Sequence, residues 1–158
     1  MTPSEQSYAE IALGENLFAL VDQRDFERLS KVRWRPYRRA NKVGVYAVSG
    51  VCVFMHRLLL GLQPRDGKLG DHINGNTLDN RRQNLRVATP AQNSQNRRCR
   101  RDSITGLKGV YPHRKRWQAA IVINGVKRYL GTFDSPELAS AAYRDAAFKN
   151  FGDFARTD

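Results

Sequence analysis

The stretch Asp71–Asn96, which reads DHINGNTLDNRRQNLRVATPAQNSQN, sets the expected structure in the middle of this chain. Its Asn74-Gly75 pair predicts a turn, and residues 84–88 (Asn-Leu-Arg-Val-Ala) predict a strand. Thr-Pro-Ala-Gln at 89–92 predicts the start of a helix, because threonine suits the N-cap, proline suits the first helical position and glutamine completes a capping box. The expected order is therefore strand, long polar loop, strand and helix.

Four side chains in this stretch combine into a candidate hydrolytic site. Asp71 and His72 close the first strand, Asn84 opens the second, and Asn93 lies one turn into the helix. Phosphodiester hydrolysis needs a base for water, and a neutral histidine is suited to that role at neutral pH. A hard divalent cation on a carboxylate and an amide oxygen stabilises the phosphorane and the leaving oxygen. Taken alone, these residues leave open a basic nucleic-acid binder with or without nuclease activity.

The direction of the first two side chains is a geometric condition on this site. Neighbours on a regular strand point to opposite faces. Asp71 and His72 can therefore serve one phosphate only if the strand ends or bulges there, or if the phosphate lies between them. The remaining loop amides, Asn74, Asn76 and Asn80, are interpreted as ordinary loop residues.

The middle of the chain resembles the HNH endonucleases, in particular the phage and intron-encoded homing enzymes. The resemblance covers about residues 55–98 and rests on four motifs: Met55–Gly61 (MHRLLLG), Asp71–Asn76 (DHINGN), Asn80–Arg86 (NRRQNLR) and Thr89–Asn96 (TPAQNSQN). It implies that His72 activates the water and that Asn84 pins the loop and helps to orient the histidine. It makes Asp71 and Asn93 the metal ligands. His56 is interpreted as a structural histidine.

The resemblance also indicates the metal. Asn93 stands where many relatives have a histidine, so an oxygen donor replaces a nitrogen donor. This substitution favours Mg²⁺ (or Mn²⁺) over zinc.

Charge indicates the partner. Lys and Arg number 27 against 15 acids, which gives a net charge of +12. The bases form three clusters with aromatic residues interleaved, in about 31–42, 97–101 and 108–128. Such a chain attracts polyanions, and double-stranded DNA is expected before an anionic membrane.

The last third has its own pattern. Strands are expected from Gly109, at 117–123 and at 127–133, with a hairpin turn at Asn124-Gly125, and a helix is expected from Ser135-Pro136 to about Asn150. Residues 106–155 resemble the DNA-binding domain of plant ethylene-response factors (the Apetala-2 fold), through motifs such as KGV at 108–110, WQAAI at 117–121 and YLGTFD at 129–134. Ala120 and Val122 depart from the charged residues of that family. The expected DNA contacts here and in the basic linker are Arg97, Arg98, Arg100, Arg101, Lys108, Tyr111, Arg114, Arg116, Lys127 and Tyr129.

The expected fold class is α+β, with four regions. These are a β-rich N-terminal region (1–54) packing on the nuclease core, a ββα-metal (HNH) core (55–98), a basic linker (99–105), and an Apetala-2-like domain (106–158) with a three-stranded antiparallel sheet packed on one helix. In the first region, Asp22 is expected to cap a helix that runs to Val32.

The two cysteines and the polar N-terminus indicate the cellular compartment. Cys52 and Cys99 lack CxxC spacing, so neither a disulfide framework nor a thiolate zinc site is expected, and each is interpreted as a small buried hydrophobe. No apolar run approaches the roughly 18–20 residues that span a bilayer. The expectation is a cytoplasmic, DNA-associated protein of a bacterial host or phage.

The function expected from all of this is metal-dependent DNA cleavage. One site per chain predicts a nick by a monomer on DNA, with a dimer left open. The alternative is a non-catalytic, sequence-specific DNA-binding regulator with a relict nuclease site, and the joint presence of all four site residues favours the nuclease. A structural RNA-binding protein rests on charge alone.

Overall fold

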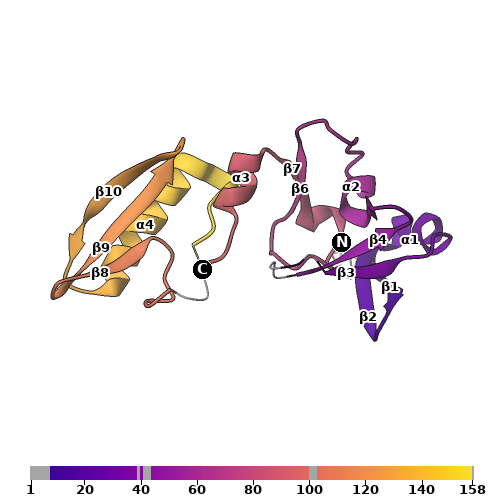
Figure 1. The fold of residues 1–158 in the computed structure, drawn as a ribbon, viewed down its shortest axis with the longest axis horizontal. Helices are drawn as coiled ribbons and strands as arrows, with labels where there is room; N and C mark the ends of the chain where they lie inside the picture. Colours follow the sequence, from indigo (N-terminus) through magenta and orange to yellow (C-terminus); the bar gives the residue numbers. More distant parts are fainter. Residues whose placement is uncertain (1–7, 39, 41–43, 100–102, 158) are drawn as a thin grey trace, which may run out of the picture. The chain divides into compact units, whose positions relative to one another are not determined.

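Four small antiparallel sheets hold the named strands of the residues that the structure describes (Figure 1). The structure is a computed structural model that describes residues 8–38, 40, 44–99 and 103–157. Its contacts divide the chain into two units, Met1–Thr89 and Pro90–Asp158. The mixed α+β class is confirmed. No helix within the described ranges is long and apolar enough to cross a membrane.

The N-terminal unit contains three of these sheets. β1 pairs with β2, β4 lies between β3 and β5, and β6 pairs with β7. The elements are β1 (Tyr8–Gly14), β2 (Leu17–Asp22), α1 (Gln23–Ser30), β3 (Arg35–Arg38), β4 (Val45–Ser49), β5 (Val53–Phe54), α2 (Met55–Leu59), β6 (Leu69–His72), the 3-10 helix η1 (Arg82–Asn84) and β7 (Leu85–Ala88). The region before residue 55 is therefore β-rich, as expected.

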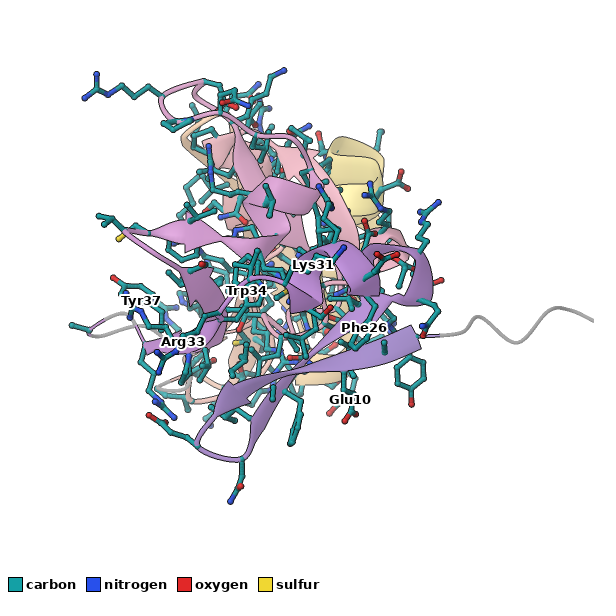
Figure 2. All side chains as sticks on the ribbon, turned by 90° about the vertical axis from the view of Figure 1, so that its right-hand side faces the viewer. Glu10, Phe26, Lys31, Arg33, Trp34 and Tyr37 are labelled. Carbon is teal, nitrogen blue, oxygen red and sulfur yellow. The ribbon has the colours of Figure 1, made fainter. Side chains whose placement is uncertain are left out.

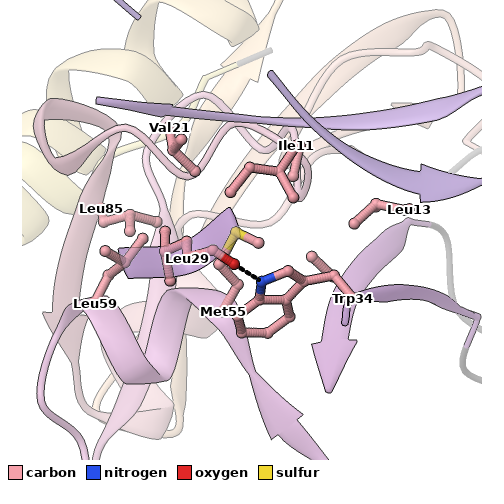
Figure 3. Close-up of a cluster of buried hydrophobic side chains, with 10 residues drawn as sticks. Ile11, Leu13, Val21, Leu29, Trp34, Met55, Leu59 and Leu85 are labelled. Atoms are coloured by element: carbon pink, nitrogen blue, oxygen red, sulfur yellow. Dashed lines mark hydrogen bonds between the residues drawn. The ribbon is translucent and has the colours of Figure 1, made fainter. Parts of the chain in front are cut away.

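One apolar core joins the first strands to the segment with the HNH-like motifs. Ile11 from β1 and Leu29 from α1 pack with Met55 and Leu85 (Figure 3). Trp34 is buried in the same cluster, and its Nε1 donates to Leu29 O at 2.8 Å. This bond matters because a buried donor without a partner costs about 1–3 kcal/mol.

β2 also bonds to the loop between β6 and β7. Leu20 N donates to Leu78 O at 2.9 Å, and Asn80 N donates to Leu20 O at 2.8 Å. These bonds make a parallel bridge between Leu20 and Asp79. The β1–β2 hairpin is therefore bonded directly to the loop that follows His72.

The C-terminal unit has the expected sheet and helix. Its elements are α3 (Pro90–Gln95), β8 (Val110–His113), β9 (Arg116–Ile123), β10 (Val126–Phe133), α4 (Pro136–Phe151) and the 3-10 helix η2 (Gly152–Phe154), and the strand order is β10-β9-β8. Asn124 and Gly125 both have positive φ, at 52° and 79°, as a primed type I turn requires. Ser135 Oγ accepts from Leu138 N and so caps α4. Ala139 and Ala147 are fully buried, and such small side chains let α4 lie close to the sheet.

Two local expectations are wrong. Asp22 occupies the N-cap position of α1 but makes no cap hydrogen bond, because its Oδ2 accepts from the backbone N of Arg82 at 2.7 Å. The cysteines are not buried: Cys52 is exposed and Cys99 is partly exposed. Cys52 lies in the turn between β4 and β5 with φ of 71°, and residues at such a turn project into solvent.

Gly109→Ala is expected to destabilise the C-terminal unit strongly. Gly109 has φ of +74°, and a Cβ there would lie 2.1 Å from Tyr143 Cδ2. Left-handed backbone at a non-glycine residue costs about 1–3 kcal/mol, and overpacking adds about 1–3 kcal/mol. Native-state hydrogen exchange of the β9 amides measures the loss. Gly106→Ala is the matched control, because Gly106 has φ of +64° with no atom within 4 Å of its Cβ. Equal losses in the two variants would contradict the clash.

Candidate active site

The β6–β7 ladder sets the directions of Asp71 and His72. The register pairs Asp71 with Arg86 and His72 with Leu85. Because successive strand residues alternate, Asp71 shares one face with Arg86, and His72 shares the other with Leu85 of the apolar core. β6 ends at His72. The strand end is one of the arrangements in which both side chains can serve one phosphate.

His72 is buried among amides and rings. Its Nε2 lies 3.4 Å from Asn80 Oδ1, and its ring centroid lies 5.0 Å from that of His56. Burial lowers the pKa of His72 below its ordinary value, although the hydrogen bond to Asn80 and the negative charges of Asp71 and Asp79 act in the opposite direction. The imidazole is therefore neutral at neutral pH, which is the state that accepts a proton.

His56 backs the His72 ring. Its own ring packs on Tyr46 and Phe54, with centroids at 5.6 and 5.5 Å. Burial, with smaller electrostatic contributions from the neighbouring His72 and Arg57, lowers the pKa of His56 to about 3. A Cβ at Gly70 would lie 2.5 Å from His56 Cδ2, so glycine in β6 gives the ring its space. His56 is thus a neutral packing partner of His72.

Asn84 closes the loop that follows β6. Its Oδ1 accepts from Asn74 N at 2.9 Å, and its Nδ2 donates to Asp79 O at 2.7 Å. Ile73 N donates to the backbone oxygen of Asn84 at 2.9 Å. One buried amide therefore bonds to both ends of the 74–79 segment, which are the contacts that a loop-holding role requires.

Asp79 and Asn80 are the residues of the site that sequence reasoning missed. Asp79 is 2% exposed, and it accepts from Arg81 Nε at 2.8 Å, from Arg81 Nη2 at 2.7 Å and from Asn74 Nδ2 at 2.9 Å. Asn80 is 1% exposed and contacts His72. The interpretation of Asn80 as an ordinary loop residue is wrong, because its amide is buried against the imidazole. Composition carries no signal for this, since asparagine is equally common in exposed turns.

Arg82 ties the start of η1 to α1 and α2. Its Nε and Nη2 donate to the Asp25 carboxylate at 2.7 and 2.9 Å, and its Nη1 donates to Leu59 O at 3.3 Å. Its backbone N donates to Asp22. Arg82 precedes Asn84 by two residues, so these bonds fix the segment from which Asn84 projects.

Asp71 offers a buried carboxylate. Arg86 Nε donates to its Oδ2 at 2.8 Å. Carboxylate and amide oxygens are hard donors that fit Mg²⁺ or Mn²⁺, which keep several waters and need few protein ligands. No group of three or more His, Cys, Asp or Glu side chains that could hold a metal ion occurs within the described ranges. The two predicted metal ligands, Asp71 and Asn93, are one carboxylate and one amide, so they do not make up a group of that kind.

Asn93 lies in α3, in the C-terminal unit, and is partly buried. The structure thus brings Asp71, His72 and Asn84 together in the N-terminal unit, whereas Asn93 belongs to the C-terminal unit.

Lys108 holds the end of the helix that carries Asn93. Its Nζ donates to Gln95 O and to Arg97 O, both at 2.6 Å. A cation at a helix C-terminus is favourable because the last carbonyls lack intrahelical partners. The expected contact of Lys108 with DNA stays a prediction, and its ammonium already has these partners within the unit.

The outer face of the C-terminal sheet carries other expected DNA contacts. Tyr111 and Tyr129 are about half exposed, and Lys127 Nζ lies 5.1 Å from the centroid of the Tyr111 ring. Tyr129 Oη is hydrogen-bonded to Thr132 Oγ1.

The expected contacting arginines lie in the β8–β9 turn, at the start of β9 and in the segment after α3. Arg116 pairs with the exposed Asp134 at 2.8 Å, and Arg114 is exposed in the β8–β9 turn. Arg97 and Arg98 follow α3. Arg100 and Arg101 lie outside the described residues.

Comparison with known proteins gives three similarities. A family model described as "HNH endonuclease" matches residues 56–95, a range that includes all four predicted site residues. The chain is 31% identical over 146 residues to an uncharacterised HNH endonuclease of Acanthamoeba polyphaga mimivirus, covering 90% of this chain and 75% of that protein. It is 33% identical over 88 residues to Protein 3.8 of Escherichia phage T7, covering 54% and 72%. No solved structure matches the chain significantly.

The Asp25–Arg82 pair is expected to make the N-terminal unit acid-sensitive. The guanidinium of Arg82 lowers the pKa of Asp25, against burial, which raises it. A carboxyl group with a lowered folded-state pKa stabilises the fold above its unfolded value of about 3.9. That contribution is lost as the pH falls through the folded-state pKa. Asp25→Asn should therefore lower the free energy of unfolding at neutral pH and flatten its decline below pH about 4.

Urea unfolding at a series of pH values measures this effect. Glu27→Gln is the matched control, because Glu27 is an exposed acid on the same helix and its ion pair is with the exposed Lys31. If Asp25→Asn and the parent lose stability in parallel at low pH, the pair does not provide the acid sensitivity.

Proposed function

This chain belongs to the HNH endonuclease family, and from that premise we propose that it is a metal-dependent endonuclease that cuts double-stranded DNA. Family membership makes it a nuclease, and hence a phosphodiester hydrolase. The proposed catalytic residues are His72 and Asn84, and the proposed metal ligands are Asp71 and Asn93. The observation that carries the assignment is the buried, neutral His72 beside Asp71 at the end of β6.

We assign the general base to Nδ1 of His72. The tautomer with hydrogen on Nε2 donates to Asn80 Oδ1, and this tautomer is assigned from the hydrogen-bond partner. Nδ1 then keeps the lone pair that takes a proton from water. The water oxygen attacks phosphorus, the bond to the 3′ oxygen breaks, and that oxygen takes up a proton. The products are a 5′ phosphate and a 3′ hydroxyl.

The other residues of the site position these groups. Asn84 holds the loop at both ends, so Asn80 stays against His72. Asp71 and Asn93 would hold Mg²⁺ or Mn²⁺, which when bound supplies Lewis-acid stabilisation of the phosphorane charge. The proposed base and the proposed metal ligand have different surroundings. His72 lies against the Asn80 amide and the His56 ring, whereas the Asp71 carboxylate accepts from Arg86.

His72→Ala is expected to lower the rate of nicking of supercoiled DNA with Mg²⁺ by at least about 100-fold, the usual range for loss of a general base. Binding of DNA should change little, because the base contributes to the transition state. Asn93→Ala should instead raise the Mg²⁺ concentration needed for half-maximal nicking. Gel electrophoresis of the plasmid forms measures both.

His113→Ala is the matched control, since His113 is an exposed histidine of the C-terminal unit. If the parent binds DNA but leaves it intact with Mg²⁺ and Mn²⁺, the chain is the non-catalytic regulator instead. If His72→Ala cuts as fast as the parent, the base is another residue.

We propose further that the C-terminal sheet holds the DNA. The support is an exposed face with Tyr111, Lys127 and Tyr129 on the side opposite α4, together with the resemblance of this region to the Apetala-2 fold. With one site per chain, the expected product is a nick, as for a homing-type enzyme acting as a monomer. Phosphate contacts would fix the register of the site on the duplex.

Lys127→Ala is expected to weaken DNA binding and to lower the slope of log affinity against log salt by about 0.9, the value for one lost phosphate contact. Lys149→Ala, on the exposed surface of α4, removes the same charge away from the sheet and should change the slope less. Fluorescence anisotropy at several salt concentrations measures the slopes. Identical slopes for the two variants would argue against contact through this face.

A further inference from the structure

The β3–β4–β5 sheet has an outer face that the sequence did not identify. Cross-strand partners share a face, and the register pairs Tyr37 with Tyr46. Arg35 and Phe54 both pair with Val48, two residues along β4 from Tyr46. These residues therefore lie on the side of the sheet opposite the core cluster, and Val48 beneath them is fully buried. We call Arg35, Tyr37, Tyr46 and Phe54 the aromatic face.

The aromatic face leads directly to His72. Ring centroids are 5.7 Å apart for Tyr37 and Phe54, 5.5 Å for Phe54 and His56, and 5.0 Å for His56 and His72. Tyr46 also reaches His72, at 6.2 Å. The rings of the face are only partly buried. The row of rings is thus partly exposed from Tyr37 to Phe54, and it continues through the buried His56 to the buried His72, the proposed general base.

Positive charge accompanies this row. Arg35 is exposed and, within the described part of the chain, has no ion-pair partner, whereas Arg38 on the other side of β3 pairs with Glu15 at 2.7 Å. Arg33, which lies two residues before β3, is also exposed and also has no ion-pair partner among the described residues. In the view of Figure 2, Tyr37 and Arg33 project on one side of the unit, away from Glu10.

We propose that the DNA strand leading to the scissile phosphate lies across the aromatic face, with Arg35 on a backbone phosphate and Tyr37 against the adjoining nucleotide. The proposal rests on the proposed function, because His72 marks where the strand must arrive. Aromatic rings beside a cationic groove are the combination that holds nucleic acid without strict sequence preference. The surface therefore positions the strand, separately from the C-terminal sheet.

Arg35→Ala in the full chain is the first test. It should raise the KM for nicking roughly tenfold and leave kcat within about twofold, because a phosphate contact is made equally before and during the reaction. Arg24→Ala is the matched control: Arg24 is an exposed arginine of α1, which packs on β1 and β2 rather than on this face.

Tyr37→Ala should raise KM by roughly tenfold as well, and Tyr37→Phe should restore the parent value, because the ring and not the hydroxyl makes the contact. Phenylalanine would restore the packing of the ring on Phe54 as well as the DNA contact. Circular dichroism and thermal unfolding of Tyr37→Ala that match the parent are therefore what separates loss of DNA contact from unfolding.

Single methylphosphonates placed along the cut strand locate the contact. The parent should lose activity at one position a few nucleotides from the cut, and Arg35→Ala should be insensitive at that same position. If Arg35→Ala behaves like Arg24→Ala and keeps the parent's methylphosphonate pattern, the aromatic face does not bind the strand. If the parent itself fails to nick DNA, the proposed function fails, and that outcome is distinguishable because it appears without any variant.

Discussion

Buried polar groups must keep hydrogen-bond partners, and this requirement governs the loop between β6 and β7. Asn84, Asp79 and Asn80 are all nearly inaccessible to solvent, and each missing partner would cost about 1–3 kcal/mol. The partners come from three directions: Asn84 within the loop, Arg81 on the Asp79 carboxylate, and Leu20 from the first hairpin. This network fixes the orientation of His72, because it holds Asn80, whose Oδ1 lies 3.4 Å from His72 Nε2.

The same requirement explains why some arginines pair with buried aspartates whereas others stay at the surface. Arg81, Arg82 and Arg86 each pair with a buried aspartate, namely Asp79, Asp25 and Asp71. These arginines hold the N-terminal unit together, so the count of 27 lysines and arginines overstates the number available to DNA. Other ion pairs are exposed, such as Arg38 on β3 with Glu15 and Arg116 in the C-terminal unit with Asp134. Exposed pairs contribute little and can open for a phosphate.

The sequence predicted local structure well where local rules decide it. The Asn-Gly hairpin turn, the Ser-Pro start of α4 and the strands of the C-terminal sheet follow from backbone conformation and capping, and all are present. The Asp22 cap failed because the Arg82 backbone, sixty residues away, takes its carboxylate. The burial of Asn80 and the ring contacts of His56 were equally invisible, since both depend on which distant strands meet. The assignment of catalytic and metal-binding roles came from the resemblance and stays a prediction.

Arg82 bonds to residues that are far from it in the sequence, and this bears on the order in which the protein folds. Its partners Asp22 and Asp25 lie 60 and 57 residues earlier in the chain, and the bonds of Leu20 to the loop span a similar separation. Contacts of high sequence separation form late, because closing a long loop costs entropy before the contact repays it. We expect the hydrogen-bond network around His72 to form only after residues 78–82 have left the ribosome and can reach the first hairpin and α1. A chain that ends before these residues therefore lacks the bonds that hold the loop beside His72.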